Sequence, residues 1–249
     1  MRKIALIGYG RWGKVLLPHL QARFEVDIFR RPNEDAFDPS IEAVVVATPI
    51  GTHPEIVRTA LEKGIPVFCE KPLATDLKVA AELIALAKEC GVHLVTDYTY
   101  TFSKRLNSAK EYLAGHEIKS LEFYLTRKSP INGRDIRWLL ACHALSVLGI
   151  FADMQNLSFH AYHEPPFNFH VISYSGDTQG TLRTAMDWSA DKTWLHIDAD
   201  SMTLTMDDLH KDDNVGSALD YFSGVLDGAI DNSRNLEQAY KITEILSKQ

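Results

Sequence analysis

The residues Lys3-Ile-Ala-Leu-Ile7-Gly8-Tyr-Gly10-Arg-Trp-Gly13 decide the fold of the first half of the chain. An apolar run (3–7) precedes glycines spaced as G-x-G-x-x-G, and a helical pattern (14–22) follows them. Glycines with this spacing between a strand and a helix are typical of a Rossmann turn that binds a dinucleotide. The alternative interpretation is a glycine-rich turn without a ligand.

Each glycine of the motif is expected to have its own steric role. Gly8 permits the tight turn, Gly10 lets the backbone approach a pyrophosphate, and Gly13 lets the helix pack closely on the strand. The first helical residues, Arg11 and Trp12, lie where backbone N–H groups and a partial positive charge face an anion. The sequence therefore predicts a dinucleotide site over residues 8–13.

Strands and helices alternate through the rest of the first half. Four further β-rich runs lie between helical patterns, at 24–29, 43–47, 66–69 and 92–97. One helix is expected to begin with the capping box Thr52-His-Pro-Glu55 and to end at Gly64, and another to run from Thr75 to Gly91. Apolar strands alternating with helices predict a parallel sheet covered on both faces. We expect an α/β, doubly wound Rossmann domain over residues 1–116.

The second half has a different pattern. A run at 118–126 and a helical pattern at 136–152 come first, and then short strands separated by turns at 157–163, 168–174, 179–188, 193–199 and 202–206. Two amphipathic helices, at 218–229 and 236–246, close the chain. Strands in series with separate helices predict an α+β domain with an open, mostly antiparallel sheet. We expect this domain to span 117–249 and to serve substrate binding and oligomerisation.

The end of the second strand bears on the choice of cofactor. An acidic residue there binds the ribose 2′-OH of NAD, whereas an arginine suits the 2′-phosphate of NADP. This chain has Phe29-Arg30-Arg31, and the arginine fork matches phosphate. We therefore expect NADP, with NAD as the alternative; the other interpretation of Arg30 and Arg31 is a solvated loop.

The connection after Arg31 is short. About ten residues lead to the next strand, whereas a crossover with its helix needs a dozen or more. One βα unit is expected to be shortened.

The composition argues against several classes of protein. The 249 residues carry a net charge of −7, and without a long basic run a nucleic-acid partner is not expected. No apolar run approaches the roughly 20 residues of a membrane span. The 3 cysteines are far apart, which favours neither a metal site nor a disulfide framework, so we expect no bound metal and a reduced, cytoplasmic setting.

A central segment carries a family resemblance. Residues 44–77 read VVVATPIGTHPEIVRTALEKGIPVFCEKPLATDL. With Ala47-Thr-Pro49 before His53, and Glu70-Lys71-Pro72 after them, the chain resembles the glucose–fructose oxidoreductase/inositol dehydrogenase (Gfo/Idh/MocA) family.

The resemblance implies an NAD(P)-dependent dehydrogenase or reductase acting on a small hydroxyl or carbonyl compound, often a sugar or polyol. Lys71 matches the catalytic lysine of the family. Thr48, Pro49 and His53 match positions near the nicotinamide half of the cofactor, and Glu70 is grouped with them. The sheet of the second domain would contact the substrate and, as is common in the family, form a homodimer.

The chemistry of hydride transfer also favours Lys71. It follows the carboxyl end of a buried strand, where open α/β sheets bind ligands. Hydride transfer to a carbonyl leaves charge on oxygen, and a cation stabilises that charge and supplies the proton. The alternative is a solvated lysine at a strand end.

The family pattern is broken in the second domain. The family commonly has D-x-G-x-H there, with a further Asp three residues after the His. In this chain His143 is kept, but Leu139 stands in place of the first Asp and Ser146 in place of the later one. Since residues i and i+4 share a helix face, the usual acid–histidine pair is missing, and Asp135 lies about 12 Å upstream along a helix. His143 is thus either a proton-transfer group acting alone or a packed residue.

Other side chains near His143 have two interpretations. Tyr98 and Tyr100 are alternative proton donors or aromatic packing. Four cationic residues lie near the same helix, and they either bind an acidic substrate or are solvated. They are Arg127, Lys128, Arg134 and Arg137. The main hypothesis is an oxidoreductase with Lys71 and His143 as catalytic residues. The second is a non-catalytic dinucleotide-binding sensor or regulatory protein, motivated by Leu139 and the shortened βα unit.

Overall fold

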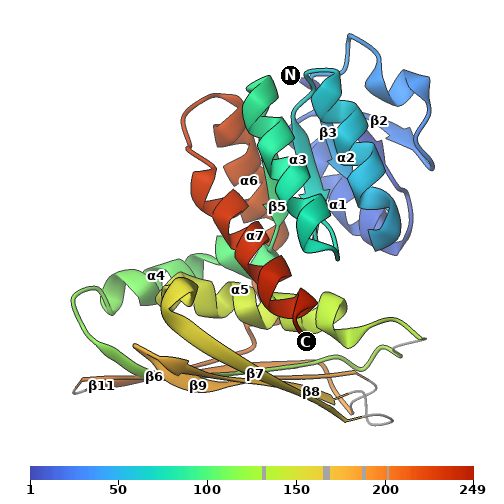
Figure 1. Cartoon of the computed structure of the whole chain (residues 1–249). Coiled ribbons are helices and arrows are strands. Elements are labelled where there is room, and N and C mark those ends of the chain that lie inside the picture. The colour runs from blue at the N-terminus through green and yellow to red at the C-terminus, as the bar shows by residue number, and fades with distance from the viewer. Residues whose placement is uncertain (131–132, 165–168, 187–188, 201) are drawn as a thin grey trace. The chain divides into compact units, whose positions relative to one another are not determined.

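The structure is a computed structural model, which describes residues 1–130, 133–164, 169–186, 189–200 and 202–249 (Figure 1). Contacts divide the chain into two units. Unit 1 contains Met1–Tyr98 and Val215–Thr243, and unit 2 contains Thr99–Asn214 and Glu244–Gln249. The domain boundary expected between 116 and 117 stays a prediction, since contacts group most of the closing helices with the N-terminal unit.

Unit 1 contains a five-stranded parallel sheet in the order β2-β1-β3-β4-β5. The strands are β1 (Lys3–Ile7), β2 (Glu25–Phe29), β3 (Ala43–Val46), β4 (Val67–Glu70) and β5 (Leu94–Asp97). The helices that lie wholly or mostly in this unit are α1 (Arg11–Gln21), α2 (His53–Glu62), α3 (Leu77–Cys90), α6 (Asn214–Leu226) and α7 (Ser233–Ser247). The predicted doubly wound Rossmann fold is confirmed.

Helices cover both faces of this sheet, as the continuous apolar strands require. Val67 and Cys69 of β4 belong to a core that includes residues of α2 and α3. Phe68 points to the opposite face, where its ring lies 5.3 Å from that of Phe222 in α6. Because both faces are buried, β3 and β4 carry almost no polar residue until Glu70.

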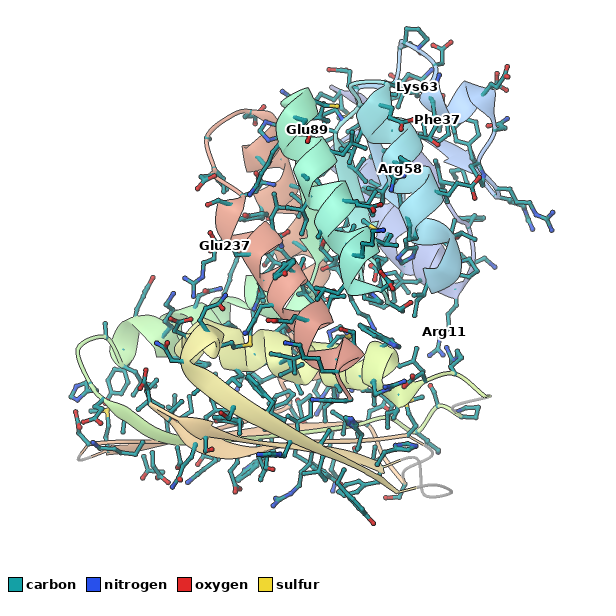
Figure 2. The ribbon with its side chains drawn as sticks, viewed as in Figure 1. Arg11, Phe37, Arg58, Lys63, Glu89 and Glu237 are labelled. Atoms are coloured by element: carbon teal, nitrogen blue, oxygen red, sulfur yellow. The ribbon has the colours of Figure 1, made fainter. Side chains whose placement is uncertain are left out.

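The shortened βα unit is also confirmed. Only the 3₁₀ turn η1 (Glu34–Phe37) lies between β2 and β3, and β3 pairs directly with β1. Phe37, labelled in Figure 2, is buried in the same core as Val44 and Ile56. The turn thus covers the core at the place where a crossover helix is missing.

The capping box predicted at Thr52 is wrong. A 3₁₀ turn, η2 (Ile50–Thr52), precedes α2, and Thr52 has helical φ and ψ of −103° and −8° without a capping hydrogen bond from its side chain. Its hydroxyl lies 2.8 Å from both Thr48 Oγ1 and the Pro49 carbonyl oxygen. The extra turn therefore directs the hydroxyl back to the end of β3. At α3 the predicted end is correct, since Gly91 has a φ of +65°.

Unit 2 contains a six-stranded sheet in the order β11-β10-β6-β9-β8-β7. The strands are β6 (Ile118–Thr126), β7 (Leu157–Glu164), β8 (Phe169–Gly176), β9 (Gln179–Ala185), β10 (Lys192–Ala199) and β11 (Met202–Asp207). All neighbours pair antiparallel except β6 and β9, so the predicted mostly antiparallel sheet is confirmed. The strand ends expected at 168 and 187–188 lie outside the described residues.

Two helices lie along one face of this sheet, α4 (Lys104–Tyr112) and α5 (Cys142–Phe151) (Figure 1). The helix predicted over 136–152 is not a regular α-helix. Residues Arg137–Ala141 form a π-helical turn, labelled η4, before α5 begins. A π turn bonds residue i to i+5, so the face shared by Leu139 and His143 cannot be derived from α-helical spacing.

Candidate functional site

The glycine motif forms a tight turn between β1 and α1. Gly8 has a φ of +103°, and a Cβ there would lie 2.5 Å from the Ala47 carbonyl carbon. A Cβ at Gly13 would lie 2.0 Å from the Gly8 carbonyl oxygen. These contacts confirm that the turn and the close packing both require glycine, because real Cβ atoms do not approach so closely.

Gly10 differs from its two neighbours in the motif. A Cβ there would meet nothing within 4 Å, so no packing within the protein explains this glycine. Gly10 is also the N-cap of α1, whose start has no side-chain cap and no acidic residue in the first turn. Open space beside an uncapped helix start fits the pyrophosphate of a dinucleotide.

The residues around this turn are largely exposed. Arg11 projects from the first turn of α1 (Figure 2). Arg30 and Arg31 are exposed just after β2. The Gly8 N–H donates to the Phe29 carbonyl at 2.8 Å, which ties the glycine turn to the strand end that carries both arginines.

The predicted nicotinamide-side residues follow β3. Thr48 is half-buried and Pro49 is exposed, whereas His53 is only 1% exposed. The two ring nitrogens of His53 lie 2.8 Å from the Pro72 carbonyl oxygen and 2.9 Å from that of Thr48. Burial lowers the pKa of His53, while these two hydrogen bonds oppose that change. His53 therefore connects the loops after β3 and β4, and it does not present its ring to solvent.

Lys71 stands at the carboxyl edge of the sheet. It is half-buried and follows Glu70, the last residue of β4, and the Lys71–Pro72 peptide bond is cis. The Trp12 indole N–H donates to Glu70 Oε1, so the side chain of Trp12 binds the protein's own carboxyl group. This contact brings three predicted site residues, Trp12, Glu70 and Lys71, together in unit 1.

Asp97 is a site residue that the sequence reading missed. It ends β5 and pairs in register with Glu70, and the two are 0% and 8% exposed. Burial, and then the Asp97 carboxyl, raise the pKa of Glu70 well above its ordinary value, while Lys71 and the Trp12 N–H lower it. The sequence contained a signal for this residue. Asp97 ends an apolar strand just as Glu70 does, and the two strands follow one another in the chain.

His143 lies in unit 2, in the first turn of α5, and is half-buried. The Tyr100 ring meets it edge-on, with the centroids 5.3 Å apart. The Tyr100 hydroxyl accepts a hydrogen bond of 3.1 Å from Arg127 Nη2, and burial raises the pKa of Tyr100. The structure thus places the Tyr100 ring against His143 and Arg127 on the Tyr100 hydroxyl, while Ser146 donates to the His143 carbonyl oxygen at 2.7 Å.

The other cations near α5 have partners within the protein. Arg137 forms an ion pair of 2.6 Å with Asp135, and Arg134 donates to the Pro130 carbonyl oxygen at 3.0 Å. Asp135 therefore binds Arg137 and does not replace the missing acid beside His143. Lys128 is exposed. Among the described residues, no group of three His, Cys, Asp or Glu side chains could hold a metal ion, and no helix has the length and apolarity needed to cross a membrane.

The fold and the glycine turn define a protein with a Rossmann domain of the dinucleotide-binding type. Residues 18–98 match a family model described as an oxidoreductase family with an NAD-binding Rossmann fold, GFO_IDH_MocA. This match confirms, over these residues, the resemblance to the Gfo/Idh/MocA family noted in the sequence.

Curated relatives match over part of their length. An inositol 2-dehydrogenase from Mycolicibacterium smegmatis is 44% identical over 64 residues, which are 26% of this chain and 19% of that protein. An NADP⁺-dependent D-xylose 1-dehydrogenase from Haloferax volcanii is 30% identical over 102 residues, 40% of this chain and 31% of the relative. The matched segments thus span well under two thirds of these relatives.

Solved structures resemble the whole chain in fold. A myo-inositol dehydrogenase from Corynebacterium glutamicum has a TM-score of 0.84 at 18% identity, covering 98% of this chain and 94% of that one. A Gfo/Idh/MocA family oxidoreductase from Vibrio cholerae has a TM-score of 0.79 at 16% identity, covering 99% and 96%. The second unit therefore has the fold found in this family.

Proposed function

We propose that the protein is an NAD(P)-dependent oxidoreductase that transfers hydride to or from a small hydroxyl or carbonyl substrate of the sugar or polyol type. The open space at Gly10 beside an uncapped helix is the observation that carries this proposal. The names of the relatives support the substrate class, since they include inositol and xylose dehydrogenases.

Each proposed role belongs to a residue of this chain. The nicotinamide ring of the bound cofactor would supply or accept the hydride. Residues 8–13 hold the pyrophosphate, Thr48 and Pro49 border the nicotinamide half, and His53 supports them through the Thr48 carbonyl. Lys71 stabilises the developing oxyanion and holds the proton at Nζ. His143, fixed by Tyr100, is the proposed second proton-transfer group on unit 2.

The assignment to Lys71 is tested by Lys71→Ala. Loss of a positioned proton donor lowers kcat by about 100-fold or more, so we expect that loss in NADPH oxidation or NADP⁺ reduction with inositols and aldoses. Lys63→Ala is the control, because Lys63 is exposed at the end of α2 (Figure 2). Wild-type turnover in Lys71→Ala would remove the lysine from the mechanism.

The preference for NADP is proposed from Arg30 and Arg31. Removing both in Arg30→Ala/Arg31→Ala should weaken NADPH binding by about tenfold or more while leaving NADH binding nearly unchanged, because only NADPH has the 2′-phosphate. Calorimetric titration with both nucleotides measures this difference. Arg58→Ala serves as the control, since Arg58 binds Glu82 on α3. Equal losses for both nucleotides would show that the pair does not select the phosphate.

A second function, that of a dinucleotide sensor without catalysis, is favoured by one observation. The acid expected beside His143 is replaced by Leu139, and the nearest carboxylate along the chain, Asp135, is bound to Arg137. A sensor would bind NADPH with normal affinity and oxidise none of the polyols or reduce none of the corresponding ketones across the pH range. Turnover that depends on Lys71 would rule this function out.

A further inference from the structure

Two carboxyl groups lie side by side in the interior of unit 1. Glu70 and Asp97 are the last residues of the neighbouring parallel strands β4 and β5, and they are paired in register. In-register residues of parallel strands point to the same face of the sheet. Since the two are 8% and 0% exposed, water does not separate or screen their charges.

The groups that act on Glu70 include a neutral donor and a cation. Glu70 accepts one hydrogen bond from the neutral Trp12 indole. Lys71 is the cation that acts on Glu70, and the buried thiol of Cys69 has a raised pKa because of burial and the two carboxyl groups. His53, from α2, also lies within electrostatic range of Lys71, and its pKa is lowered. Lys71 is thus a cation next to this pair of acids.

The closeness of the two carboxyl groups points to a proton. The in-register pairing places them next to each other at the ends of two buried strands. Adjacent carboxylates that share a low-dielectric site do not both ionise.

We propose that Glu70 and Asp97 share one proton at neutral pH, so that the pair presents a single negative charge to the neighbouring Lys71 ammonium. Asp97 is then a positioning residue, which acts on Lys71 through Glu70. The proton sharing is a property of the protein alone, whereas its use in catalysis rests on the proposed function of Lys71.

Three variants separate the charge of the carboxyl pair from the size of its side chains. In Asp97→Asn the introduced amide replaces the shared proton as a hydrogen-bond donor, and Glu70 keeps the single negative charge. In Glu70→Gln the charge remains on Asp97. In Glu70→Gln/Asp97→Asn the charge is lost, although the side chains keep their size. Glu55→Gln, at an exposed carboxylate of α2, is the matched control.

Infrared spectroscopy of the protein without nucleotide tests the shared proton. At neutral pH, wild type should show the carbonyl-stretch band of a protonated carboxyl group, moved to lower frequency in D₂O. Asp97→Asn and Glu70→Gln should each lose this band, and Glu55→Gln should keep it. A wild-type spectrum without the band overturns the proposal, and so does a band that survives unaltered in either variant. The wild-type measurement decides the question even if a variant does not fold.

The NMR signal of Lys71 tests the effect of the charge without any substrate. Lysines methylated with ¹³C-formaldehyde are followed at neutral pH, and the Lys71 signal is assigned by its absence in Lys71→Arg. The signal should keep its wild-type chemical shift in Asp97→Asn and should move in the double variant, because the neighbouring charge is then lost. A Lys71 signal that does not move in the double variant overturns the proposed role. If the infrared and NMR results are as expected but the protein turns over no substrate, the shared proton stands and only the proposed function is contradicted.

Discussion

Gly10 and Gly13 stand three residues apart in one motif, but packing within the protein requires glycine only at Gly13. A Cβ at Gly13 would lie 2.0 Å from the Gly8 carbonyl oxygen, whereas one at Gly10 would enter open space. Gly13 is therefore constrained by packing. The space at Gly10 is open to a ligand, because no atom of the protein occupies it.

Alanine substitutions should separate these two reasons. Gly13→Ala is expected to lower the free energy of unfolding by about 1–3 kcal/mol, since α1 must move away from the turn. Gly10→Ala should unfold at the wild-type temperature but lose at least tenfold in NADPH affinity, because the methyl group occupies the space for the pyrophosphate. Thermal melting with and without NADPH measures both. Full NADPH affinity in Gly10→Ala would contradict the assigned site.

At the scale of elements, the start of α7 completes the edge of the parallel sheet. Asn235 is buried; its Oδ1 accepts from the Thr96 N–H at 2.8 Å, and its Nδ2 donates to the Thr96 carbonyl oxygen at 2.9 Å. Asn232 Nδ2 donates to the Leu94 carbonyl oxygen at 2.7 Å. Two side chains thus provide β5 with hydrogen bonds that a further strand would otherwise supply.

Asn235→Ala should therefore destabilise unit 1. It leaves a buried N–H and a buried C=O of Thr96 without their partner, which costs about 1–3 kcal/mol for each group. Denaturant unfolding should show a loss of roughly 2–5 kcal/mol, and hydrogen exchange should accelerate at β5. Asn232→Ala, at a less buried side chain, should lose less. Equal losses in the two variants would show that the paired bonds of Asn235 are not what holds β5.

The elements themselves follow closely from the sequence, whereas some of their ends and pairings do not. Hydrophobic period and glycine placement are local, so β1, β3, α3 and most strands of unit 2 lie where the pattern predicts. The sequence pattern did not predict the 3₁₀ turn before α2 or the π turn before α5. The parallel pairing of β6 with β9 depends on connections that a local pattern does not contain.

At the scale of the whole molecule, each unit contains a buried titratable group, and the two respond to pH in opposite directions. In unit 1 the pKa of Glu70 is raised, so the native state keeps a proton that the unfolded state releases above about pH 4.5. In unit 2 burial lowers the pKa of His170 to about 4 from 6.5. The native state then excludes a proton that the unfolded state binds.

The signs follow from proton linkage. The Glu70 contribution to stability is present below its unfolded pKa and is lost as pH rises through the raised folded value. The His170 contribution is present above pH 6.5 and is lost as pH falls towards 4, which corresponds to at most roughly 3 kcal/mol. Alkaline conditions should weaken unit 1, and acidic conditions should weaken unit 2.

Hydrogen exchange measured by mass spectrometry at several pH values, corrected for intrinsic rates, checks both directions. Protection of β4 and β5 should decline with rising pH in wild type and stay flatter in Glu70→Gln. Protection of β8 should decline with falling pH and stay flatter in His170→Phe, while His160→Phe, at another exposed histidine of β7, should behave as wild type. If the protection of both units changed in the same direction with pH, the roles assigned to Glu70 and His170 would be contradicted.

The sequence by itself determined the Rossmann unit, its glycine turn, its shortened βα connection and the mostly antiparallel sheet of the second unit. These features arise from steric limits and hydrophobic periods within a few neighbouring residues. Only the tertiary structure decided that Glu70 faces Asp97, that His53 is enclosed between two loops and that Tyr100 lies against His143. The chemical state of a side chain depends on the charges and hydrogen-bond partners that folding brings to it from distant parts of the chain.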